Sequence, residues 1–166
     1  QGFYHMNSTN NYHNLKKSYD NAKLIITTSK NSVSYLKTMF PNLRKKIFKI
    51  NLSIDRNKFK IKKKSNIITY MPRKLPEHSN LLLFYLKNLL PKNWKILPLI
   101  NVSDKKLIKS LSISKIFLSF SNFEGMGLPP IEAALSGNKV IGYVGGGGSE
   151  YWKKPIFTKV ENGEIE

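Results

Sequence analysis

The sequence predicts an α/β fold in which a parallel sheet is covered by helices on both faces. Short apolar and β-branched runs alternate with segments of helical periodicity along most of the 166-residue chain. Most of these runs are apolar throughout, which is the pattern of strands buried on both sides. The chain is long enough for a full hydrophobic core, and 40% of its residues are hydrophobic. No apolar run approaches the roughly 20 residues that span a bilayer.

The first part of the chain predicts two strands with a helix between them. Residues 24–28 form a β-branched run that is typical of a buried strand. Ser29 is expected to cap a helix that Pro41 ends, because serine accepts from free helix amides and proline cannot continue a helix. The alternating stretch 47–52 predicts the second strand. Residues 1–20 are polar and indicate no element.

The pattern restarts after a basic connector at residues 56–64, which holds six Lys and Arg in nine positions and predicts a linker or domain edge. A strand is expected at 67–71, with Arg73 and Lys74 in the loop that follows it. The remaining expected elements are, in order, a helix at 81–90 capped by Ser79, an edge strand at 94–100 that contains Pro98, a helix capped by Ser103 and Asp104, and strands at 116–120 and 140–144.

Charge and composition limit the classes of function. The formal net charge is +18, yet residues 121–166 hold only four of the 28 Lys and Arg and six of the ten acids. A basic excess fits nucleic acid, an anionic membrane or phosphorylated ligands; the alternative is an AT-rich gene, because 25 of the 28 basic residues are Lys. The absence of cysteine excludes disulfides and thiolate metal sites and suits a reducing compartment. Metal-ligand spacing is also missing from the three histidines, His5, His13 and His78.

A glycine-rich loop and the helix after it carry the most specific chemistry. The run Glu124-Gly125-Met126-Gly127-Leu128 leads into a helix that opens with two prolines and contains Glu132. Glycines let a ligand approach backbone amides, and a helix start presents unpaired N–H groups. Glu132 could accept the two hydroxyls of a ribose, and Glu124 could accept those of a hexose. Alternatively, both acids are favoured by the helix dipole alone.

Two further loops could complete a site for a phosphorylated ligand. The glycine run 145–148 offers amides of the same kind, or it is a flexible turn. The Arg73 guanidinium can donate two parallel hydrogen bonds and the Lys74 ammonium adds a compact positive charge, which together suit a diphosphate. Alternatively, the two side chains are a solvated pair. All three loops follow expected parallel strands, so they are expected at one edge of the sheet.

The stretch from Glu124 to Ala133 resembles the E-x7-E motif of retaining GT-B glycosyltransferases, most closely family 4 (glycosyl transferases group 1). The similarity extends to 68–74 and 140–150 and, further upstream, to 24–29 and 47–55. It implies that residues 61–166 form the Rossmann-like, nucleotide-sugar-binding C-terminal domain of a GT-B enzyme, incomplete at its C-terminus. Residues 1–60 would then be the end of the acceptor-side N-terminal domain and the linker. The chain is accordingly expected to be a fragment that binds donor weakly or not at all by itself.

The same resemblance implies a role for each candidate site residue. Glu132 would hold the ribose and Glu124 the transferred sugar, as the two catalytic carboxylates. Arg73 and Lys74 would bind the diphosphate, although many members of the family place the Lys several residues after the Arg. The other implied donor-binding residues are Gly125, Met126, Gly127, Leu128, Gly146 and Gly147.

The implied reaction transfers a hexose from a nucleotide-diphosphate-sugar to a glycan or lipid-linked acceptor with retention of configuration. The leaving phosphate would help to deprotonate the acceptor, without a metal or a cofactor. The expected setting is cytoplasmic polysaccharide biosynthesis, with peripheral contact at an anionic inner membrane face and no nucleic acid. Two alternatives remain: a GT-B-like sugar-nucleotide epimerase or phosphorylase, and a non-enzymatic basic nucleic-acid-binding domain.

Overall fold

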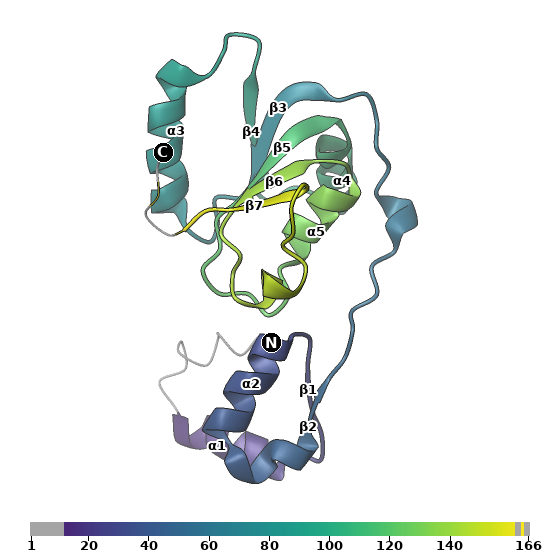
Figure 1. Cartoon of the computed structure of the whole chain (residues 1–166), viewed down its shortest axis with the longest axis vertical. Helices are drawn as coiled ribbons and strands as arrows, with labels where there is room; N and C mark the ends of the chain where they lie inside the picture. The colour runs from purple at the N-terminus through teal and green to yellow at the C-terminus, as the bar shows by residue number, and fades with distance from the viewer. Residues whose placement is uncertain (1–11, 162–163, 165–166) are drawn as a thin grey trace. The chain divides into compact units, whose positions relative to one another are not determined.

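The computed structural model of the chain forms two compact units (Figure 1) and describes residues 12–161 and residue 164. The first unit comprises Gln1–Ser53 with two loops from later in the chain, Phe123–Gly127 and Gly145–Tyr151. The second unit comprises Ile54–Asn122, Leu128–Val144 and Trp152–Glu166. His5 lies outside the described residues, and the expected domain boundary at residue 60 stays a prediction.

The first unit is built on a short parallel pair of strands. Its elements are α1 (Tyr12–Asn21), β1 (Ile25–Thr27), α2 (Lys30–Met39), η2 (Pro41–Lys46) and β2 (Ile47–Lys49). Ile25 pairs with Ile47, and both side chains are buried in one apolar cluster with Leu36, Phe40 and Leu43. The predicted cap is confirmed, because Ser29 Oγ accepts the Ser32 N–H at 3.1 Å.

Helix α1 was not predicted, because its sequence offers few apolar positions. Its Tyr19 ring stacks on Phe40 with the ring centroids 5.1 Å apart. The helix is therefore stabilised by a contact that is distant in the sequence, which local periodicity does not reveal.

The second unit contains a five-stranded parallel sheet, which confirms the predicted α/β class. Its strands lie in the order β4-β3-β5-β6-β7. Pro98 ends the edge strand β4, as predicted. The elements from residue 54 onward are η3 (Arg56–Lys58), β3 (Ser65–Tyr70), α3 (Pro76–Leu89), β4 (Lys95–Pro98), α4 (Asp104–Ile113), β5 (Ser114–Ser119), α5 (Leu128–Leu135), β6 (Lys139–Gly142), η4 (Gly147–Glu150, within the first unit) and β7 (Phe157–Lys159).

Helices lie on both faces of this sheet (Figure 1). On the α3 face, Ile68 and Leu118 are buried, and Leu82 of α3 packs against them. On the opposite face, α4 and α5 pack against β3, β5 and β6 and against one another. Side chains alternate between these faces along each strand, so Phe117, at 2% exposure, belongs to the opposite face from Leu118.

Two details of the second unit differ from the sequence prediction. Helix α3 begins at Pro76 and not after Ser79, because proline is favoured in a first turn and Glu77 complements the dipole there. Ser79 is fully buried and donates to the Pro76 carbonyl at 3.0 Å instead of capping the helix. Strand β7, around the buried Phe157, was not predicted because three residues carry too little periodicity.

Two polar side chains tie α4 and α5 to the sheet and the linker. Asn138, 3% exposed, donates to the carbonyls of Leu111 and Ala133 at 2.8 and 2.9 Å and accepts from Ser114 Oγ at 2.5 Å. Lys64 Nζ donates to the carbonyls of Leu111 and Ser136 at 3.1 and 2.5 Å, near the C-terminal ends of both helices. Burial lowers the pKa of Lys64.

Replacing Asn138 by alanine should cost about 2–4 kcal/mol of unfolding free energy, because several buried polar groups lose a partner together. Urea denaturation of the variant should show this loss. The matched control is Asn66→Ala, since the Asn66 side chain accepts from the exposed Lys115 ammonium, and its cost should stay below about 0.5 kcal/mol. Equal stability of the two variants would contradict a structural role for Asn138.

Candidate functional site

Two glycine-rich loops, Phe123–Gly127 and Gly145–Tyr151, meet through their backbones within the first unit. The Glu124 N–H donates to the Gly145 carbonyl at 2.7 Å, and the Gly147 N–H is shared between the Glu124 carbonyl at 3.1 Å and the Gly145 carbonyl at 3.0 Å. Glu124 and Gly146 form an isolated parallel bridge. The backbone position of Glu124 is therefore fixed at both its amide and its carbonyl by the second loop.

Gly147 is the point of closest approach between the two loops. A Cβ on Gly147 would lie 1.9 Å from the Gly125 carbonyl oxygen, so no larger residue fits without moving backbone. A Cβ on Gly125 would meet only Thr28 Oγ1, at 3.5 Å. Glycine is therefore required at position 147 because no side chain fits there, and not because the loop must be flexible.

Tyr151 closes the far side of the first loop. Its hydroxyl oxygen lies 2.8 Å from the carbonyl oxygens of both Met126 and Gly127, as a donor that these two acceptors share. Gly127 is buried and has a φ of 75°, which glycine adopts without strain. Nothing local in the sequence indicated Tyr151, because the contact joins residues 24 and 25 positions apart.

The second unit carries the other candidate residues on elements that follow neighbouring strands. Arg73 and Lys74 lie in the turn between β3 and α3, with Arg73 exposed and Lys74 half-buried. Glu132 lies in α5, the helix that follows β5, and Leu128 is the first residue of that helix. Because β3 and β5 pair in parallel, their carboxyl ends reach the same edge of the sheet.

Glu132 is a carboxylate held in an unfavourable environment. It is half-buried, and within the described part of the chain its side chain has no hydrogen-bond or ion-pair partner. Burial raises the pKa of Glu132 above its ordinary value, and the negative charge of Asp104 raises it further. A partly desolvated acid without a partner destabilises the fold, which is a physical mark of a functional position. Asp104 entered the sequence analysis only as a helix cap.

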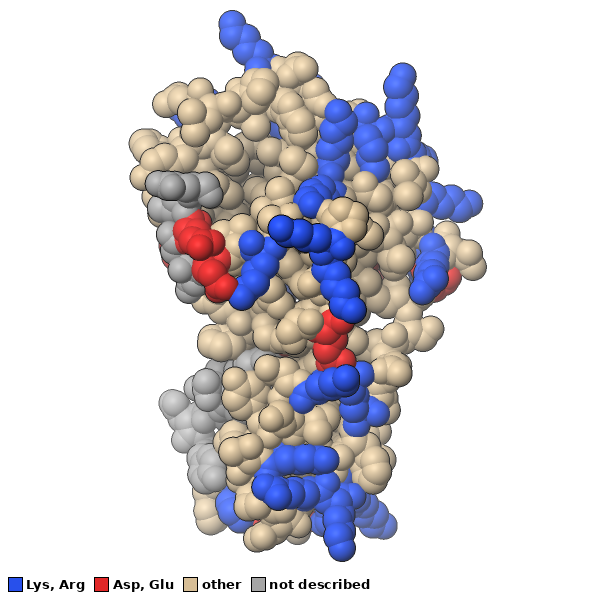
Figure 2. Space-filling model, in the orientation of Figure 1, with Lys and Arg blue, Asp and Glu red and all other residues tan. Residues whose placement is uncertain are grey.

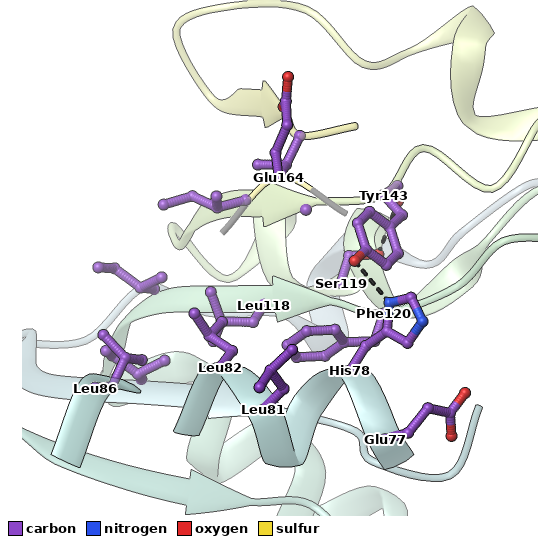
Figure 3. Close-up of a pocket in the computed structure, with 15 residues that line it drawn as sticks. Glu77, His78, Leu81, Leu82, Leu86, Leu118, Ser119, Phe120, Tyr143 and Glu164 are labelled. Atoms are coloured by element: carbon purple, nitrogen blue, oxygen red, sulfur yellow. Dashed lines mark hydrogen bonds between the residues drawn. The ribbon is translucent and has the colours of Figure 1, made fainter. Parts of the chain in front are cut away.

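A cavity of about 630 Å³ opens between α3 and the sheet of the second unit (Figure 3). Aliphatic side chains of α3 and of strands β3, β5 and β6 form most of its wall, including Leu82 and Leu118. His78 Nδ1 and the Tyr143 hydroxyl lie 2.8 Å apart in the polar part of the wall. None of the residues predicted to bind donor or to act in catalysis lines this cavity.

The face drawn in Figure 2 carries many more basic than acidic side chains. Lys and Arg are scattered over the visible face among uncharged residues, with few acids between them (Figure 2). No group of three or more His, Asp or Glu side chains among residues 12–161 and 164 could hold a metal ion. Across these same residues, no helix has the length and apolar character needed to cross a membrane.

The fold is shared with solved glycosyltransferases, although no protein-family model and no curated protein matches the sequence. A glycosyltransferase from Rickettsia africae ESF-5 superposes with a TM-score of 0.62 at 18% identity, over 92% of this chain and 54% of that one. A chain of the GtfA/B complex superposes with a TM-score of 0.55 at 16% identity, over 95% of this chain and 38% of that one. The pneumococcal O-GlcNAc transferase GtfA, solved with UDP and GlcNAc, superposes with a TM-score of 0.55 at 15% identity, over 93% of this chain and 37% of that one. This chain thus spans about half, or less, of the length of these solved chains.

Replacing Gly147 by alanine should force the two loops apart and cost about 2 kcal/mol or more of unfolding free energy, because the new methyl group meets backbone. Gly125→Ala is the matched control, since its methyl group finds ordinary contact distance. Urea unfolding of both variants compares them directly. A Gly147 variant as stable as the Gly125 variant would contradict the close approach.

The raised pKa of Glu132 makes a pH-dependent prediction. Below the ordinary value of 4.5 the acid is protonated in both the folded and the unfolded chain and costs nothing. As the pH rises through the raised pKa, the buried charge destabilises the folded state. Glu132→Gln should therefore raise the thermal midpoint at about pH 7 and leave it unchanged near pH 4. Glu77→Gln, at an exposed position in the first turn of α3, is the control and should not raise the midpoint at pH 7. A lower midpoint of Glu132→Gln at pH 7 would contradict the assignment.

Proposed function

We propose that this chain is the donor-binding part of a retaining GT-B glycosyltransferase of the family-4 type, together with the end of its acceptor-side domain. The enzyme transfers a hexose from a nucleotide-diphosphate-sugar to a glycan or lipid-linked acceptor. The observation that carries the proposal is Glu132, a half-buried carboxylate without a partner among the described residues, in a fold shared with glycosyltransferases. Such a group gains its missing hydrogen bonds when a ligand with two hydroxyls binds.

Glu132 holds the ribose of the donor in this proposal. A carboxylate accepts two hydroxyl hydrogen bonds at once, and hydrogen bonds to a charged group contribute more than those between neutral groups. Because Glu132 is already partly desolvated in the folded chain, the ligand does not have to remove its water. The folded protein therefore bears the free-energy cost of desolvating Glu132, and the hydrogen bonds to the ligand contribute their full free energy to binding.

Glu124 contacts the transferred sugar, and the glycine loops receive the donor phosphates and sugar oxygens. Support comes from the backbone bonds that fix the Glu124 main chain at both its amide and its carbonyl, because a fixed main chain limits where the carboxylate can lie beside a reacting sugar. Arg73 and Lys74 bind the diphosphate from the turn after β3. The remaining donor contacts belong to Gly125, Met126, Gly127, Leu128, Gly146 and Gly147.

The reaction breaks the bond between the anomeric carbon and the diphosphate oxygen and forms the new glycosidic bond on the same face of the sugar. The leaving phosphate accepts the proton of the acceptor hydroxyl, so the protein needs no separate base. Neither a metal nor a cofactor takes part. The basic excess of residues 1–120, which hold 24 Lys and Arg against four acids, would favour an anionic membrane surface that carries a lipid-linked acceptor.

Product analysis of the full-length protein with a panel of nucleotide-diphosphate-sugars and glycan or lipid-linked acceptors tests the reaction. Release of nucleoside diphosphate with a glycosylated product, whose anomeric configuration by NMR matches the donor, is the expected result. An epimerised donor, or a sugar phosphate formed from the glycan when inorganic phosphate is added, would instead indicate an epimerase or a phosphorylase and would overturn the proposal.

Alanine variants of the two carboxylates should separate binding from turnover. Glu132→Ala is expected to raise the donor KM about 10- to 100-fold, because a charged group's hydrogen bonds are lost in the bound state. Glu124→Ala should lower kcat about 100-fold or more. Glu77→Ala is the control acid and should leave both constants within about twofold. Full activity in both site variants would contradict the site.

A further inference from the structure

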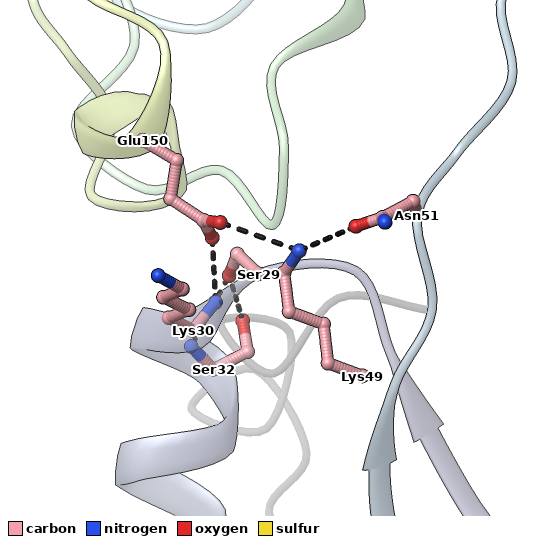
Figure 4. Close-up of polar contacts among 6 residues, drawn as sticks. All are labelled: Ser29, Lys30, Ser32, Lys49, Asn51 and Glu150. Atoms are coloured by element: carbon pink, nitrogen blue, oxygen red, sulfur yellow. Dashed lines mark hydrogen bonds and ion pairs between the residues drawn. The ribbon is translucent and has the colours of Figure 1, made fainter.

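Glu150 joins the second glycine loop to two elements of the first unit (Figure 4). Its Oε1 accepts the backbone N–H of Lys30 at 2.6 Å, and its Oε2 lies 3.3 Å from Lys49 Nζ. Lys49 Nζ also donates to Asn51 Oδ1 at 2.7 Å. One carboxylate therefore binds the start of α2 with one oxygen and the end of β2 with the other.

The environment of Glu150 makes these contacts stronger than those of a surface ion pair. The side chains of Lys49 and Glu150 are only 23% and 22% exposed, so water screens their attraction weakly. Lys30 is the first residue of α2, and its amide has no acceptor inside that helix. Removing the carboxylate would leave this N–H and the Lys49 ammonium each without their charged acceptor.

A short path of backbone contacts leads from Glu150 to Glu124. Glu150 ends the single turn η4, which begins at Gly147. The Gly147 N–H donates to the Glu124 carbonyl, and no Cβ fits between Gly147 and the first loop. A displacement of η4 therefore moves the group that fixes the Glu124 carbonyl.

We infer that Glu150 is a positioning residue that holds the second glycine loop against α2 and β2 and thereby sets the position of Glu124. Its kinetic consequence rests on the proposed function, in which Glu124 contacts the transferred sugar. Glu150 does not touch the donor. It acts through the backbone of other residues: its loss should lower turnover through Glu124 and raise the donor KM by a smaller factor through Gly146 and Gly147 of the same loop.

Steady-state kinetics of the full-length protein give the first test. Glu150→Ala should lower kcat about 10- to 100-fold, as a displacement of about 1 Å does, and raise the donor KM by a smaller factor, because Gly146 and Gly147 belong to the displaced loop. Glu150→Gln keeps an acceptor for the Lys30 N–H and loses the ion pair, so its kcat should be intermediate. Unchanged kcat in Glu150→Ala, or a loss that lies wholly in KM, would overturn the inference.

A double-mutant cycle separates this role from a general effect of charge. Lys49→Met should lower kcat in the same direction, and Glu150→Ala with Lys49→Met should be no slower than Glu150→Ala alone, because Lys49 acts through Glu150. Glu161→Gln is the matched control, since Glu161 pairs with Lys159 at the surface. Additive losses in the cycle, or an equal loss in the control, would contradict positioning by Glu150.

Amide hydrogen exchange, followed by NMR, tests the same contacts without any enzymatic activity. Glu150→Ala should speed exchange of both the Lys30 and the Gly147 amides by at least about tenfold. Faster exchange at Lys30 alone would show that Glu150 only caps α2, which overturns the inference. If the wild-type protein transfers no sugar from any donor, the proposed function fails, while the exchange result still decides whether Glu150 holds the loop.

Discussion

The backbone contact between the loops Phe123–Gly127 and Gly145–Tyr151 is the constraint on which the position of Glu124 in the first unit depends. Ser119 pairs with Gly142, so the chain leaves both strands at the same level of the sheet. The two segments that follow then meet backbone to backbone, with Glu124 bonded to Gly145 and Gly147. These backbone contacts fix the main-chain position of Glu124. Helix α5 fixes the main-chain position of Glu132.

Local signals predicted the elements whose stabilising contacts are local. Ser29 and Ser103 cap helices as expected, and Pro98 lies in an edge strand, because each acts within a few residues of itself. Ser79 misled the prediction because Pro76 and Glu77 give a stronger helix start just before it. Helix α1 was missed because its support, the stack of Tyr19 on Phe40, lies across the chain.

The candidate site follows the same division between local and distant information. The sequence indicated which loops carry the chemistry and that Glu132 lies about one turn into a helix. It did not indicate that Gly147 is excluded from bearing a side chain, that Tyr151 closes the first loop, or that Asp104 acts on Glu132. Each of these depends on a contact between residues far apart in the chain, which a strand-and-helix pattern leaves open.

The close approach at Gly147 also limits which codon changes the folded protein can accommodate at that position. The protein is rich in Lys, Asn and Ile, which A- and T-rich codons encode, whereas every glycine codon begins with two guanines. The four consecutive glycines therefore contrast in codon composition with the Lys, Asn and Ile around them. Any change at either of the first two bases of the Gly147 codon would end the chain or introduce a side chain whose Cβ overlaps the Gly125 carbonyl oxygen. Every such replacement is therefore a steric change, whichever residue it introduces.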